Sequence, residues 1–199
     1  MSLRDELLQA ETPAPRGFSI LAPPSWEKFD ADEAGRKVLE SRLRDRFRSI
    51  GRPELEGQTR AMARQQWKRL AEMRAFAVYM PMTPTIEGAT PMSMITARWD
   101  ARGEFETDLR ARAGHEVERV ETSIGTVFRW DHEQAGRGEL SGVPSRQHNF
   151  VFPFPVAEPR RGVLVKIAIV HPDEEQAGEA LVGFSALAES MAETFRWRM

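Results

Sequence analysis

The feature that most constrains the fold is a stretch at residues 162–170 that is apolar at nearly every position. Successive side chains of a β-strand point to opposite faces of the sheet, so an unbroken apolar run needs cover on both faces. A strand with both faces covered lies in the middle of a sheet rather than at its edge. We therefore place residues 162–170 at the centre of a sheet.

Other parts of the chain show the shorter, two-residue period that is typical of strands. They are rich in β-branched, aromatic or methionine residues, and proline or glycine turns separate them. A short strand at 18–21 is also predicted, and Pro23 and Pro24 end it because proline cannot donate to a β-ladder. The remaining predicted strands are 75–82, 92–99, 117–122, 126–134 and 147–154.

Helical periodicity appears before, within and after this region. Between residues 31 and 50, apolar residues recur at steps of 4, 4 and 3, which places them on one face of a helix. Further helices are predicted at 54–74 and 104–112. After Pro172, Asp173 and Gln176 are spaced to cap a final amphipathic helix that packs on the sheet.

These elements together predict an α+β fold, with one antiparallel sheet of about six or seven strands flanked by helices as an α/β/α sandwich. The first residues, 1–16, are predicted to form an arm with a short polar helix that ends at two prolines, Pro13 and Pro15. Residues 17–199 are predicted to form a single domain, which suits the length of 199 residues.

Composition excludes several kinds of chemistry. There is no cysteine, which rules out disulfides, thiolate metal sites and cysteine nucleophiles. No histidine pair has the spacing of a helical metal site, and no serine lies in a Gly-x-Ser-x-Gly elbow. We therefore expect no cofactor and no metal. Acidic residues near the start and the lack of a long apolar run predict a cytoplasmic protein without membrane contact.

The order of elements and several local sequences resemble the PsbP-like fold group. The residues that carry this resemblance are Pro23-Pro24-Ser25-Trp26, Gly125-Thr126-Val127-Phe128-Arg129 and the end of the chain, Ala192-Glu193-Thr194-Phe195-Arg196-Trp197. The group includes PsbP proteins, Ran-binding Mog-type proteins, actinobacterial LpqN-type lipoproteins and DcrB-like proteins. The resemblance implies a module that binds another protein rather than an enzyme, with a chaperone or secretion-accessory role as one form of it.

Charge indicates where such a partner would bind. Residues 31–74 carry 12 basic and 7 acidic side chains, whereas residues 75–199 carry 13 basic and 18 acidic ones. We therefore expect a partner surface on the first two helices, at Arg44, Arg48 and Arg52, or on the loop at 135–146. Nucleic acid is a less favoured partner, because arginines two residues apart do not share a helical face.

Two other constellations lead to the alternative function, a small-ligand protein or an enzyme. A hairpin centred near residue 140 would place His132 and His148 opposite each other on one face, as a weak polar pair. A pocket between the sheet and the helices would be lined by Trp67, Trp99 and Trp130.

Overall fold

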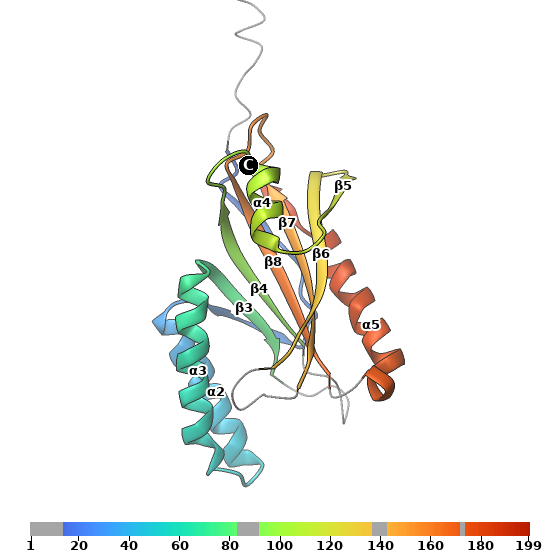
Figure 1. Cartoon of the computed structure of the whole chain (residues 1–199). Helices are drawn as coiled ribbons and strands as arrows, with labels where there is room; N and C mark the ends of the chain where they lie inside the picture. The colour runs from blue at the N-terminus through green and yellow to red at the C-terminus, as the bar shows by residue number, and fades with distance from the viewer. Residues whose placement is uncertain (1–13, 83–91, 137–142, 172–173) are drawn as a thin grey trace, which may run out of the picture.

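The computed structural model describes residues 14–82, 92–136, 143–171 and 174–199. Its main element is an antiparallel seven-stranded sheet with the strand order β2-β3-β4-β8-β7-β6-β5 (Figure 1). This confirms the predicted α+β class. The strands are β2 (Trp26–Asp30), β3 (Ala75–Pro81), β4 (Met92–Asp100), β5 (Glu118–Thr122), β6 (Gly125–Gln134), β7 (Ser145–Pro153) and β8 (Arg161–Val170).

The apolar strand β8 is the central strand, as its sequence predicts. It pairs with β4 on one side and with β7 on the other. Val165, Ile167 and Ile169 on one face are fully buried, whereas Leu164 and Lys166 on the other face are half-buried. Both faces of β8 are therefore covered, but one is covered more completely.

Helices flank the sheet on both faces. The helix α5 (Glu174–Glu193) packs on the face that carries Met94 and Ile167. The opposite face is covered at one end by α2 (Glu33–Ser49) and α3 (Leu55–Glu72), and at the other end by α4 (Phe105–Ala113) (Figure 1). The molecule is thus a layered sandwich with helices on each side of one sheet.

Helix bounds agree with the periodicity to within one or two residues at the ends that the structure describes. Asp32 caps α2, because its carboxylate accepts a hydrogen bond of 2.8 Å from the Gly35 amide. Glu104 caps α4, and Gly114 ends it in the left-handed conformation with φ 67°. The predicted arm helix before Pro13 and the predicted cap at Asp173 lie outside the described residues.

A second, two-stranded sheet pairs the two ends of the described chain. Its strands are β1 (Gly17–Ser19) and β9 (Arg196–Arg198), with Phe18 opposite Trp197. Phe195, just before β9, is fully buried and stacks on Phe152 at 3.9 Å between ring centroids. This contact holds the small sheet against the α5 face of the large sheet.

The sequence did not predict β2 or β9. Strand β2 directly follows the Pro23-Pro24 break and buries only Phe29 fully, so its pattern is too short to show a period. Strand β9 consists of Arg196, Trp197 and Arg198, a composition that does not indicate a strand before its pairing is known.

Among the residues that the structure describes, no helix is both long and apolar enough to span a bilayer.

Candidate functional site

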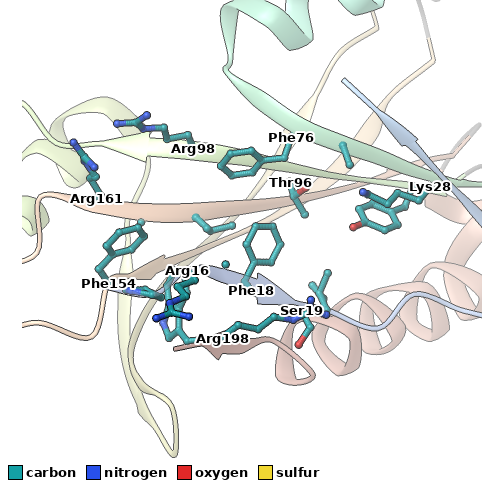
Figure 2. Close-up of a pocket in the computed structure, with 18 residues that line it drawn as sticks. Arg16, Phe18, Ser19, Lys28, Phe76, Thr96, Arg98, Phe154, Arg161 and Arg198 are labelled. Atoms are coloured by element: carbon teal, nitrogen blue, oxygen red, sulfur yellow. The ribbon is translucent and has the colours of Figure 1, made fainter. Parts of the chain in front are cut away.

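A large cavity lies between the small sheet and the large one. It has a volume of about 640 Å³, and its lining residues come from both sheets (Figure 2). Strands β1 and β9 form one wall, and β3, β4 and β8 contribute the other. The site is therefore assembled from segments that are more than a hundred residues apart in the sequence.

The charge of this cavity is one-sided. Its lining residues include no carboxylate and five basic side chains: Arg16, Lys28, Arg98, Arg161 and Arg198. Figure 2 shows Arg98 and Arg161 toward one end of the cavity and Lys28 toward the other. A cavity lined by one sign of charge attracts ligands of the opposite charge.

Carboxylates just outside the cavity hold three of these cations. Arg98 Nε lies 2.7 Å from Asp100 Oδ1, and Arg161 Nε lies 3.9 Å from the same oxygen. Lys28 Nζ lies 2.8 Å from Asp30 Oδ1. Burial works to raise the pKa of Asp100, but hydrogen bonds and charge from Arg98 and Arg74 outweigh burial and lower this pKa.

Arg16 and Arg198 differ from these three, because neither has a carboxylate partner among the residues that the structure describes. The two lie side by side through the small sheet, where the Arg16 amide donates to the Arg198 carbonyl at 2.8 Å. The register of β1 with β9 places the side chains of Arg16 and Arg198 on opposite faces of the small sheet. Each guanidinium group lacks a described counter-charge and is therefore available to an anion.

Aromatic rings make up much of the remaining lining. Phe18 and Phe76 lie 5.8 Å apart between centroids, and Phe154 meets Trp197 edge to face at 5.1 Å. Phe76 is 44% exposed although it is a large apolar side chain. Exposed aromatic surface inside a cavity is energetically unfavourable in water and favours a ligand that covers it.

One polar group in the wall of the cavity is unsatisfied. Thr96 on β4 is fully buried, and its Oγ1 has no hydrogen-bond partner among the described residues. A buried hydroxyl without a partner costs free energy, about 1–3 kcal/mol. Figure 2 places Thr96 between Phe18 and Lys28. Because its hydroxyl has almost no accessible surface, a ligand in the cavity would not reach it.

The predicted partner residues lie elsewhere, on α2 and just after it. Arg44 donates to Ser41 Oγ at 3.0 Å, and Arg48 Nη2 lies 3.9 Å from Glu56 Oε2. Arg52 is hydrogen-bonded to Glu54. Nearby acidic side chains therefore neutralise part of the positive charge that the sequence places on this surface.

The predicted pair of His132 and His148 does not form. In the register of the sheet, Asp131 is opposite His148 and Gln147 is opposite His132, so the two histidines point to different faces. His148 faces α5, whereas His132 stacks on His115 at 4.4 Å. The predicted pairing of β6 with β7 was therefore wrong by one residue. Because side chains alternate between the two faces of a strand, a shift of one residue moves each side chain to the other face.

The three tryptophans do not share a pocket. Trp99 and Trp130 pack in one hydrophobic cluster with α4, and Trp67 packs in a separate cluster with α2 and β2. All three are buried, and none lines a described cavity. The predicted pocket lined by all three tryptophans therefore does not form, because they belong to two separate hydrophobic clusters. The cavity between the two sheets lies on the opposite face of the large sheet.

Sequence reasoning missed the cavity because its walls meet only through the pairing of β1 with β9. The sequence contains one weak indication of this pairing. Each end of the described chain has an arginine close to an aromatic residue, Arg16 and Phe18 at one end and Trp197 and Arg198 at the other. No protein-family model and no curated protein matches this sequence.

Proposed function

We propose that the protein binds a small anionic molecule with an aromatic or other apolar part in the cavity between the two sheets. The one-sided charge of the cavity is the observation that carries this proposal, since five basic and no acidic side chains line it. The exposed ring of Phe76 supports it, because this ring would gain a contact from a ligand. The cavity volume of about 640 Å³ suits a ligand of drug or cofactor size.

A matched pair of fluorescent probes tests this function. Anilinonaphthalene sulfonate carries an anionic group on an aromatic body, and N-phenyl-1-naphthylamine is its uncharged counterpart. We expect the sulfonate to bind more tightly than the neutral probe. The double variant Arg16→Ala with Arg198→Ala should weaken sulfonate binding by about tenfold or more, because each lost charge-assisted contact is worth about 1.5–3 kcal/mol.

The control variant removes the same charge from another surface. Arg64 and Arg69 on α3 are exposed and lie outside the cavity, so Arg64→Ala with Arg69→Ala should leave sulfonate affinity unchanged. Equal losses in the two double variants would show that net charge, rather than this cavity, attracts the probe. Equal affinity in the wild type and in the Arg16 and Arg198 variant would refute the proposal.

A second candidate function is the binding of another protein through the α2–α3 pair. The specific observation in its favour is that this pair exposes apolar as well as basic side chains: Val38 is 51% exposed and Ile50 is 56% exposed. The resemblance to PsbP-like proteins supports the same function, including a chaperone or secretion-accessory role. Charge reversal at Arg44 and Arg48 should then abolish partner capture from a cell lysate, and unchanged capture would exclude this surface.

A further inference from the structure

Three polar side chains from three different elements converge on the α5 face, outside the proposed anion-binding cavity. Asp131 is on β6, His148 is its register partner on β7, and Ser185 is on α5. His148 Nδ1 lies 3.0 Å from Asp131 Oδ1, and His148 Nε2 lies 3.1 Å from Ser185 Oγ. The order carboxylate, imidazole, hydroxyl is the order in which a nucleophilic serine is activated.

The local structure explains why these groups meet. Ser185 is four residues after Leu181 and three before Ala188, and both of these are buried against the sheet. This spacing turns the Ser185 side chain toward β7. His148 is only 3% exposed, whereas the Asp131 side chain is 56% exposed. The angle between His148 Nδ1 and the Asp131 carboxylate is too poor for a hydrogen bond, although the two atoms are close. Such poorly aligned contacts are common between catalytic groups before substrate binds.

A cavity lies next to this constellation, although Ser185, His148 and Asp131 are not among its lining residues. It has a volume of about 520 Å³, and three of its lining residues are the next neighbours of the constellation on the same faces. Arg129 is two residues before Asp131, Phe150 is two residues after His148, and Glu189 is one helical turn after Ser185. Its remaining apolar lining is Val120, Ile124, Val127, Phe152 and Ala192. Glu121, Glu193 and Arg196 add charge to the same cavity, so an apolar acyl group would contact only the apolar part of its lining.

We propose that Ser185, His148 and Asp131 form a nucleophilic site that hydrolyses carboxylic esters with an apolar acyl group. Ser185 Oγ gives its proton to His148 Nε2 and forms a bond to the carbonyl carbon, while the electron pair of the C=O bond moves to its oxygen. When the C=O bond re-forms, the bond to the alcohol breaks, and the alcohol takes the proton from Nε2. Water then repeats both steps on the acyl-serine, releasing a carboxylic acid and restoring Ser185.

Asp131 and Arg129 assist the reaction without forming a bond to the substrate. Asp131 orients the imidazole and stabilises its protonated form, as the carboxylate of such a site does. The amides near Ser185 are used within α5, so they are not free to stabilise the oxyanion. Arg129, which lines the neighbouring cavity, would supply the positive charge that stabilises the oxyanion. Its partners are Glu118 at 2.7 Å and, more distantly, Glu189 at 3.9 Å.

A fluorophosphonate probe tests the site on the intact protein, because it phosphonylates activated serines and the modified residue can be mapped by mass spectrometry. We expect a single adduct on Ser185, and slow hydrolysis of p-nitrophenyl butyrate. Ser185→Ala should lose both. Asp131→Asn, a change at a half-exposed carboxylate, should slow labelling by at least about a hundredfold.

Ser190→Ala is the matched control, since Ser190 is an exposed serine on the same helix. It should be labelled as fast as the wild type. Circular dichroism must show that each variant is folded. Absence of labelling in the folded wild type, an adduct spread over several serines, or unchanged labelling of Asp131→Asn would each overturn the proposal. Labelling of Ser185 is independent of Arg16 and Arg198, so the two proposed functions can fail separately.

Discussion

At the scale of single residues, Glu133 illustrates how one side chain links pH to stability. It accepts from Arg146 Nε at 2.6 Å, and its Oε2 lies 3.2 Å from Nε2 of His171, which is almost fully buried. Burial works to raise the pKa of Glu133, but hydrogen bonds and charge from Arg146 and His171 outweigh it and hold this pKa below its ordinary value of 4.5.

A lowered carboxyl pKa stabilises the fold above the unfolded pKa, and the contribution is lost as pH falls through the folded pKa. We therefore expect Glu133→Gln to reduce the free energy of unfolding at pH 7 by less than about 1 kcal/mol, because partly exposed ion pairs are screened by solvent. Urea denaturation at several pH values should show this difference shrinking below about pH 5. A difference that grows as pH falls would contradict the assignment.

At the scale of elements, the junction between β2 and α2 depends on one glycine. A Cβ built on Gly35 would lie 2.0 Å from the Asp30 carbonyl oxygen, which belongs to the backbone and cannot move aside cheaply. We expect Gly35→Ala to lower the free energy of unfolding by about 1–3 kcal/mol or more, measured by urea denaturation.

Gly57 is the matched control for this prediction. It also lies in a helix, α3, but nothing approaches its Cβ position within 4 Å. Gly57→Ala should therefore stabilise the protein, by about 0.4–1 kcal/mol, because alanine loses less conformational entropy on folding. If both substitutions changed stability by the same amount, the close approach of α2 to β2 would not be the cause.

The same elements show what the sequence could and could not predict. The periodicity of the sequence predicts helices α2 and α3 and strands β4 and β8. Each of these elements has a regular pattern of buried residues along at least one face. The position of His148 could not be predicted, since a shift of one residue in the pairing of β6 with β7 moves it to the other face. Ser185 belongs to no sequence motif, and only the packing of α5 on β7 brings it to His148.

At the scale of the whole molecule, the fold and the anion-binding cavity have different structural requirements. The large sheet and its helices contain almost all the buried residues of the three hydrophobic clusters, although not Phe195. The cavity also needs the small sheet that closes over it. Residues 196–199 contribute β9 to that sheet but lie after Phe195, the last fully buried residue. Their removal should therefore separate binding from folding.

We expect a chain that ends at Phe195 to unfold cooperatively in urea, with a modest loss of stability because the half-buried Trp197 no longer contacts Phe154 and Phe195. Its affinity for anilinonaphthalene sulfonate should fall by more than that of the Arg16 and Arg198 double variant, because the truncation removes Arg198, Trp197 and the partner strand of Arg16 together. Retention of wild-type affinity by the shortened, folded chain would locate the anion site elsewhere. Labelling of Ser185 by the fluorophosphonate should persist in this chain, since α5 and β7 keep their contacts without β9.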